Sequence, residues 1–208
     1  MAGFYAAYHG AEGLKKIANR ILRYRETLKT ALKWCGKNVD DCEGFDTIRV
    51  EADAEEYKSI KEEFNVRYED GWIIISIDEL TTLSELHEIL KTQVTFDSRS
   101  DTINHVYSGC KTYVWRFIPK RSGEWLTQEV FNKYQSETNM MRYIYELVSK
   151  DFSLVNGMMP LGSCTMKLNA ASELMPVSWN EFANIHPFAP KNQTYGYQRI
   201  AEDLKEWL

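Results

Sequence analysis

The sequence lacks the long apolar segments of membrane proteins and the flexible runs of linkers. None of its apolar runs, such as WIII at residues 72–75, approaches the roughly 20 residues that cross a bilayer. Residues 1–8 carry neither the basic start nor the long apolar core of a secretory signal. Glycine (11) and proline (5) are scarce, so extended flexible linkers are not expected. We therefore expect an intracellular protein with no membrane span and no targeting signal.

The cysteine pattern and the charge exclude two further classes of protein. The four cysteines form no C-x-x-C pair and have no paired histidine ligands; they are Cys35, Cys42, Cys110 and Cys164. This spacing indicates neither a zinc site nor a disulfide framework, and free thiols in a reducing compartment are expected. The net charge of -5 and the pI near 5.5 argue against nucleic-acid binding.

The residues that are present predict a folded α/β protein, since 44% are hydrophobic and 26% charged. Asp53 with Glu56 and Thr82 with Glu85 are typical capping boxes at helix starts, and the Glu69-Asp70-Gly71 step predicts a hairpin turn. Apolar periodicity then predicts helix, strand, helix, two strands and helix over residues 10–34, 45–50, 53–63, 65–68, 71–77 and from 82 onward. This order favours helices that cover one face of a small, largely antiparallel sheet.

The remainder of the chain is predicted to be mostly helical. Residues 113–118 alternate like a strand with apolar residues on both sides, and the nearby Arg116, Lys120 and Arg121 are expected on a solvated surface. Ser136 is predicted to cap a helix through Ser149, whose buried stripe would comprise Met140, Met141, Ile144, Leu147 and Val148. Residues 197–208 predict an amphipathic helix, and the chain stops within its pattern, which suggests truncation.

Two irregular segments carry the polar groups expected at a site. Residues 154–170 include PLGSCTMKLNA (160–170), where Gly and Pro interrupt regular structure and Ser163, Cys164 and Thr165 offer polar groups. Residues 179–190 read WNEFANIHPFAP, where the turn before Pro187 could aim the His186 ring at a ligand. A satisfied structural histidine is the equally weighted alternative.

These two segments, together with YHGAEGL at residues 8–14, resemble the P-protein of the glycine cleavage system, the pyridoxal-phosphate-dependent glycine decarboxylase. The resemblance runs from about residue 4 to 208 and is weak between 91 and 120. Family enzymes are several times longer. The resemblance therefore implies an internal fragment that holds the end of the first homologous half and the beginning of the second.

The implied fold is α/β, of the aspartate-aminotransferase-like (fold type I) kind. Residues 1–120 would be the small C-terminal domain that ends the first half, and residues 121–208 a connecting arm with an incomplete N-terminal part of the second half. A regulatory ligand-binding domain has a similar order of elements and is the competing interpretation. No anion-binding glycine loop supports it.

The resemblance implies a pyridoxal phosphate cofactor in the complete enzyme, whose chemistry needs a Schiff-base lysine. The family's lysine follows a histidine ahead of a glycine-rich segment, and this chain has no His-Lys and no Gly-Gly step. Lys167 belongs to a separate family pattern, so we expect no covalent cofactor and no catalytic residue here. Gln135 and Asn156-Gly157 also replace residues that include a histidine in most family members, which puts full activity in doubt.

Two hypotheses about function follow. In the first, the chain is a fragment or split subunit of glycine decarboxylase, which acts on glycine and passes an aminomethyl group to the lipoylated H-protein. Ser163, Cys164, Thr165 and His186 would then line the substrate or lipoyl channel, with catalytic groups supplied by the remainder of the P-protein. In the second, the chain is a non-catalytic interaction module that pairs with a full-length homologue. The compartment would be the mitochondrial matrix in a eukaryote and the cytoplasm in a bacterium.

Overall fold

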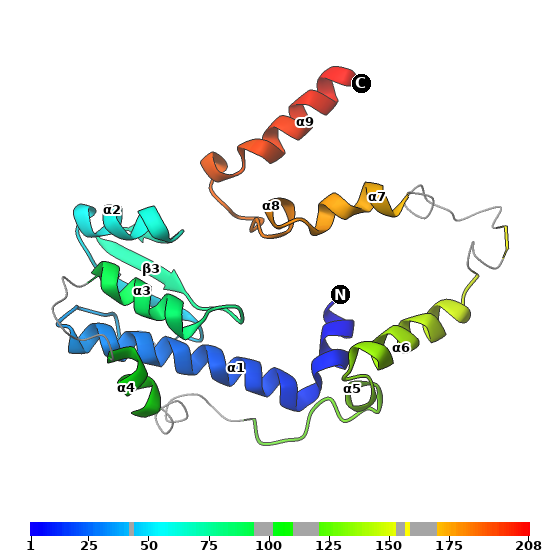
Figure 1. The fold of residues 1–208 in the computed structure, drawn as a ribbon, viewed down its shortest axis with the longest axis horizontal. Helices are drawn as coiled ribbons and strands as arrows, with labels where there is room; N and C mark the ends of the chain where they lie inside the picture. The colour runs from blue at the N-terminus through cyan, green and yellow to red at the C-terminus, as the bar shows by residue number, and fades with distance from the viewer. Residues whose placement is uncertain (42–43, 94–101, 110–120, 153–156, 159–169) are drawn as a thin grey trace. The chain divides into compact units, whose positions relative to one another are not determined.

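The computed structural model describes residues 1–41, 44–93, 102–109, 121–152, 157–158 and 170–208 (Figure 1). The chain divides into two compact units, Met1–Tyr145 and Glu146–Leu208, called here the N-terminal and C-terminal units. Within the described residues, no helix is long and apolar enough to span a membrane.

The N-terminal unit is organised along one long helix, α1 (Ala2–Trp34). The predicted helix over residues 10–34 is confirmed, and a further helical segment, residues 2–9, precedes it across a kink at Gly10. Gly10 has φ 61° and ψ -178°, a conformation that is almost restricted to glycine. The helix ends as predicted near Gly36, whose φ of 81° lets the Lys37 N–H donate back to the Leu32 carbonyl at 3.0 Å.

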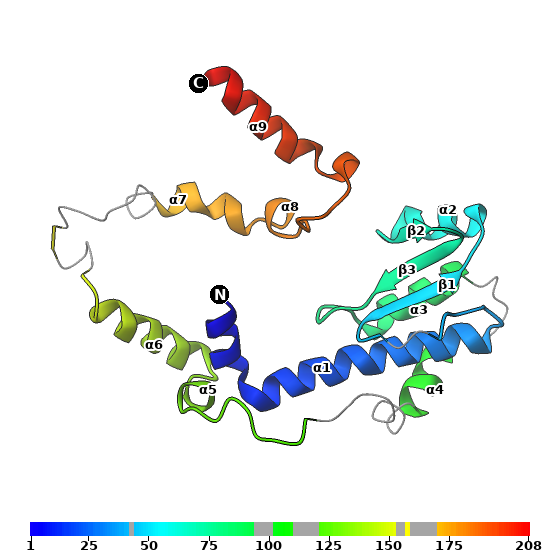
Figure 2. The same ribbon diagram turned by 180° about the vertical axis from the view of Figure 1, so that it is seen from behind.

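Three antiparallel strands form a sheet in the order β1-β3-β2, from β1 (Thr47–Glu51), β2 (Arg67–Glu69) and β3 (Trp72–Ser76) (Figure 2). Glu69 pairs with Trp72 across a two-residue turn in which Asp70 (φ 52°) and Gly71 (φ 81°) are both left-handed. Such a turn matches the twist of a hairpin, so the sheet and the turn are both confirmed.

Both predicted capping boxes are present at the starts of α2 (Ala54–Glu63) and α3 (Leu83–Gln93). The Asp53 carboxylate accepts the Glu56 backbone N–H at 2.9 Å, and the Glu56 carboxylate accepts the Asp53 N–H at 3.2 Å. At α3, the Glu85 carboxylate accepts the Thr82 N–H at 2.6 Å. These bonds satisfy donors that a helix start otherwise leaves unpaired.

The helices cover one face of the sheet, as predicted. Ile48 and Val50 of β1 point to the same side as Ile73 and Ile75 of β3, and all four are at most 2% exposed. The helical residues that pack into the same cluster include Leu28, Leu32, Ile60, Leu86, Leu90, Ile103 and Val106. The last two belong to α4 (Thr102–Gly109), a helix that the sequence did not predict. The predicted strand over residues 113–118 lies outside the described residues.

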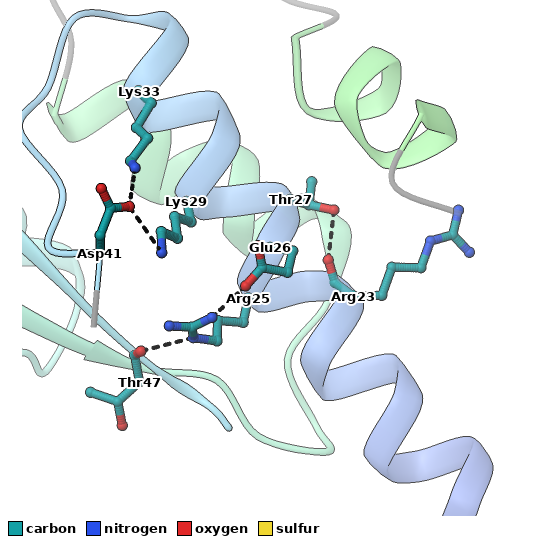
Figure 3. Close-up of polar contacts among 8 residues, drawn as sticks. All are labelled: Arg23, Arg25, Glu26, Thr27, Lys29, Lys33, Asp41 and Thr47. Atoms are coloured by element: carbon teal, nitrogen blue, oxygen red, sulfur yellow. Dashed lines mark hydrogen bonds and ion pairs between the residues drawn. The ribbon is translucent and has the colours of Figure 1, made fainter. Parts of the chain in front are cut away.

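Charged side chains tie α1 to its surroundings (Figure 3). Arg25 is only 5% exposed; its Nε donates to the Thr47 carbonyl of β1 at 3.0 Å, and its guanidinium pairs with Glu26. Lys33 and Lys29 both approach the Asp41 carboxylate, and they lower the pKa of that carboxyl. The buried arginine thus joins helix and sheet by a charge-assisted hydrogen bond.

Two shorter helices, α5 (Val130–Lys133) and α6 (Glu137–Ser149), meet the start of α1. The Phe4 ring packs edge-on against Tyr143 at 6.2 Å, and Tyr143 stacks on Tyr134 at 4.1 Å between centroids. Ala7 is 2% exposed and Met140 is 9% exposed. This second, small core anchors residues 2–9.

The predicted start of α6 is confirmed, because the Ser136 hydroxyl accepts the Asn139 N–H at 3.3 Å. The predicted burial of its stripe is wrong except at Met140. Met141 is 62% exposed, and the other three members are 37% to 46% exposed. The physical reason is that the residues described around α6 cover it on one side only, at Met140 and Tyr143.

The C-terminal unit consists of short helices and one longer one. They are α7 (Ala171–Leu174), the 3-10 turn η2 (Met175–Ser178), α8 (Asn180–Ala183), the 3-10 turn η3 (Lys191–Gln193) and α9 (Tyr195–Trp207). The helix predicted over residues 197–208 is confirmed and begins two residues earlier. Ile200 and Leu204 remain 51% and 50% exposed. Among its described residues, the unit buries no side chain.

Candidate functional site

The structure places one of the four predicted site residues. Ser163, Cys164 and Thr165 lie in 159–169, outside the described residues, so their predicted roles stay predictions. His186 is described, in the turn that follows α8. The candidate site is therefore built around this histidine.

Aromatic packing connects this turn to α9 within the C-terminal unit. The Tyr197 hydroxyl in the first turn of α9 donates to the Phe182 carbonyl of α8 at 2.8 Å. The two rings meet edge-on at 6.0 Å, and Trp179 lies 6.3 Å from Phe182. This contact holds the two ends of the 184–194 segment together.

One nitrogen of His186 has a structural role. Its Nδ1 accepts the Phe188 backbone N–H at 3.0 Å, and its own carbonyl accepts the Ala189 N–H at 2.9 Å. A neutral ring with Nδ1 as acceptor carries its proton on Nε2. The side chain is exposed, so Nε2–H can donate to a group outside the turn. The structural role weighed from the sequence is thus present at Nδ1, and the ligand-facing role stays a prediction.

An open groove of about 680 Å³ adjoins this ring. We call it the His186 groove; it is lined by Ile185, His186, Pro187, Ala189, Lys191, Thr194, Tyr197 and Gln198. The Gln198 amide donates to the Lys191 carbonyl at 2.8 Å and to the Thr194 hydroxyl at 3.0 Å, which fixes the far wall. The sequence did not single out Lys191, Thr194 or Gln198. The sequence signal available for this wall was Thr194, because a threonine directly before an apolar helical pattern is typical of a helix N-cap.

The lining carries one cation and no carboxylate, which favours a neutral or anionic group. It does not fit pyridoxal phosphate, because no acidic partner for the pyridine nitrogen stands beside Lys191. Nor does the described part of the chain bring together three side chains that could hold a metal ion. The groove can bind and orient, and by itself it offers no complete catalytic set.

Gln135 and Gly157, two of the departures from the family pattern, lie within the described residues. The Gln135 amide donates to the Phe131 carbonyl at 3.1 Å and contacts Gly10 at the kink of α1. A Cβ at Gly157 would lie 2.9 Å from the Phe152 ring. Asn156 lies outside the described residues.

A second groove, of about 980 Å³, runs in the N-terminal unit between α1 and residues 121–127. Leu22, Phe45 and Trp125 supply apolar walls, and Arg121 is exposed, as predicted, with its guanidinium 5.5 Å from the Trp125 ring. Leu126 has a φ of 52°, and the Asn132 side-chain amide donates a hydrogen bond to the Leu126 carbonyl at 3.2 Å. Both acidic and basic side chains, among them Glu12, Lys15 and Glu124, stand beside these apolar walls.

Comparison with known proteins identifies the protein family that the chain resembles. Residues 1–93 match the family model described as Glycine cleavage system P-protein. The resemblance predicted from the sequence motifs is thereby confirmed.

The particular relatives are enzymes called glycine dehydrogenase (decarboxylating). The whole chain is 46% identical to that of Parasynechococcus marenigrum (strain WH8102), 43% identical to that of Prochlorococcus marinus (strain MIT 9303) and 42% identical to that of Aliivibrio fischeri (strain MJ11). In each case it spans 22% of the relative's length.

Proposed function

We propose that this chain is a fragment or split subunit of glycine decarboxylase, the P-protein that decarboxylates glycine and transfers the aminomethyl group to the lipoyl arm of the H-protein. The observation that carries the proposal is sequence identity of 42% to 46%, over the whole chain, to enzymes called glycine dehydrogenase (decarboxylating). The chain spans 22% of their length, so most of the machinery lies elsewhere. The compartment would be the bacterial cytoplasm or, in a eukaryote, the mitochondrial matrix.

In this proposal residues 1–120 correspond to the small domain of a fold type I half, and residues 121–208 to the arm that begins the second half. The three-stranded sheet with helices on one face supports the first assignment. The cofactor would supply an electron sink when bound to the complete enzyme. The role of this chain would be to position groups around substrate: Ser163, Cys164, Thr165 and His186, with His186 Nε2 as a hydrogen-bond donor.

The chain alone is expected to be inactive, because it lacks the family's lysine for the cofactor. Purified chain mixed with pyridoxal phosphate should give no absorbance band of a lysine-bound cofactor and no adduct trapped by borohydride. It should also release no CO2 from labelled glycine. A lysine-dependent trapped adduct would contradict the proposal.

The site residues can be tested in a chimaera, in which this chain replaces the matching stretch of the Parasynechococcus marenigrum enzyme. Thr165→Ala and His186→Ala should lower turnover more than they lower the melting temperature, if these groups face substrate. His105→Ala is the control, because His105 lies on α4 outside the groove. If the groups only satisfy buried backbone, each change should cost about 1 to 3 kcal/mol of stability and leave turnover per folded molecule intact.

The second candidate is a non-catalytic interaction module that pairs with a full-length homologue. The exposed apolar residues of α9 favour it, since contiguous exposed apolar surface usually marks an interaction site. The two candidates separate in the chimaera: a fragment of the enzyme restores glycine decarboxylation, whereas a module binds the homologue without contributing to turnover.

A further inference from the structure

Helix α6 carries more apolar surface than its neighbours cover. Seven of its 13 residues are apolar or aromatic: Met140, Met141, Tyr143, Ile144, Tyr145, Leu147 and Val148. At about 100° per residue they span roughly 200° of the circumference. A helix with one buried side typically shows an apolar stripe of roughly 100°. The sequence of α6 is therefore suited to contact on two sides.

The chain itself provides one of these contacts. Met140 is 9% exposed, and Tyr143 lies between the rings of Phe4 and Tyr134. This side of α6 is fixed by the segment of α1 before the Gly10 kink. The polar residues Asn139 and Arg142 lie roughly opposite the remaining apolar side, which begins at Ile144.

The other side is exposed. We call Met141, Ile144 and Tyr145 the outer face of α6; they are 62%, 37% and 75% exposed. Met141 and Tyr145 are one turn apart, so their side chains are neighbours on the surface. Met141 and Tyr145 thus keep most of their surface accessible in the folded N-terminal unit, and Ile144 keeps about a third of its own.

We propose that the outer face of α6 is the docking surface for the part of the P-protein that this chain does not contain. The inference rests on the proposed function. The relatives are similar over all of this chain, α6 included, and about four-fifths of their length lies outside the stretch it matches. That sequence can supply an apolar partner, whereas an isolated chain of this kind leaves the face in water at a cost in solubility. The partner surface is apolar and uncharged where it meets Met141 and Tyr145.

The test compares the maleimide labelling rates of two variants, Met141→Cys on the outer face and Asn139→Cys on the polar side of the same helix. Each is introduced into the isolated chain and into the chimaera, and maleimide labelling is followed peptide by peptide by mass spectrometry. Met141→Cys should label rapidly in the isolated chain and at least about tenfold more slowly in the chimaera, as expected for a side chain at the dry centre of an interface. Asn139→Cys should label at similar rates in both.

The outcomes separate the inference from the proposed function. A chimaera that decarboxylates glycine but labels at Met141→Cys as fast as the isolated chain overturns the docking surface and leaves the function standing. A folded chimaera that does not decarboxylate glycine, even when Gln135→His and Asn156→His restore the family's histidines, overturns the function. Protection of Met141→Cys in the isolated chain, with dimers in solution, assigns the face to a second copy and also overturns the inference. If the chimaera does not fold, the aligned positions of the Parasynechococcus marenigrum enzyme carry the same pair of substitutions.

Discussion

Both units of the chain form regular helices, but they differ in how they bury them. The N-terminal unit joins three strands and four helices around one apolar cluster, with Leu28, Ile60, Ile73 and Leu86 fully buried. The C-terminal unit forms α9 with an equally regular apolar spacing, and among its described residues nothing is buried. Local sequence signals therefore suffice to specify a helix, while burial depends on a partner surface that a given stretch of chain does or does not contain.

The largest expected effect comes from deleting one leucine side chain in each unit. Leu28→Ala should lower the free energy of unfolding by about 2 to 5 kcal/mol, because the fully buried side chain leaves a cavity. Leu204→Ala, at a position 50% exposed, should change it by less than about 0.5 kcal/mol in the isolated chain. Urea denaturation followed by circular dichroism measures both. Comparable losses at the two positions would mean that α9 is packed in solution.

The next effect concerns the joint at Gly10, which connects the small core at residues 2–9 to the rest of α1. Gly10→Ala should destabilise the N-terminal unit by about 1 to 3 kcal/mol, because the backbone conformation excludes a Cβ. That Cβ would also lie 2.7 Å from the Phe131 carbonyl oxygen. Gly36→Ala is the matched control: its φ is also positive, but nothing lies within 4 Å of its Cβ.

If Gly10→Ala and Gly36→Ala lower the stability equally in thermal unfolding, only the backbone strain matters and the contact with α5 is loose. A larger cost at Gly10, with lost packing of the Tyr134 and Tyr143 rings in near-ultraviolet dichroism, is the expected result.

The next effect is smaller and of opposite sign: a gain in stability is expected on substitution of Gln93, at the end of α3. Its side chain is 3% exposed, and within the described residues neither amide atom has a hydrogen-bond partner. Gln93→Met should therefore raise the free energy of unfolding by about 1 kcal/mol, because it removes an unsatisfied buried amide. Thr27→Val should instead lower it, because the buried Thr27 hydroxyl donates to the Arg23 carbonyl at 2.7 Å. A loss of stability in Gln93→Met would point to a partner for the amide in solution.

The smallest effect is a pH dependence from Asp78, in the loop between β3 and α3. Burial raises the pKa of this carboxyl, but hydrogen bonds from the Thr81 hydroxyl and from the Leu80 and Thr81 N–H groups outweigh it and leave the pKa below its ordinary value of 3.8. The stabilisation is therefore complete above that value and is lost as the pH falls through the lower folded pKa. Wild type should lose more stability between about pH 5 and about pH 2 than Asp78→Asn does. Parallel acid transitions of the two proteins would exclude the effect.

Much of the N-terminal unit could be predicted from sequence because its signals are local. Asp53 with Glu56, Thr82 with Glu85 and the Asp70-Gly71 turn each specify a structure within a few residues, and each is confirmed. The helix α4 was missed because only Ile103 and Val106 mark its buried side, too few for a periodic pattern. The segment before Gly10 was missed because glycine usually ends a helix, whereas here it joins two.

The candidate site was less predictable, because its parts meet through distant contacts. His186 was found as a polar group in an irregular motif, but the bond between Tyr197 and the Phe182 carbonyl, which brings α9 to the same groove, spans 15 residues. The burial predicted for Met141 failed for a similar reason. Periodicity shows that a side is apolar, and it does not show whether the covering surface belongs to the same stretch of chain.

The kink at Gly10 also determines how α1 works as a mechanical element. Between the kink and Trp34 the helix runs uninterrupted for about 36 Å, at 1.5 Å per residue. It is held at one end by the small core around Ala7 and at the other by the main apolar cluster, against which Ile17 is partly buried and in which Ile21 is buried. Helix α1 is therefore a continuous rod that is packed against other elements near both of its ends. Because Gly10 is the one residue of α1 with non-helical φ and ψ, a change of angle at this kink would tilt residues 11–34 together as a single rod.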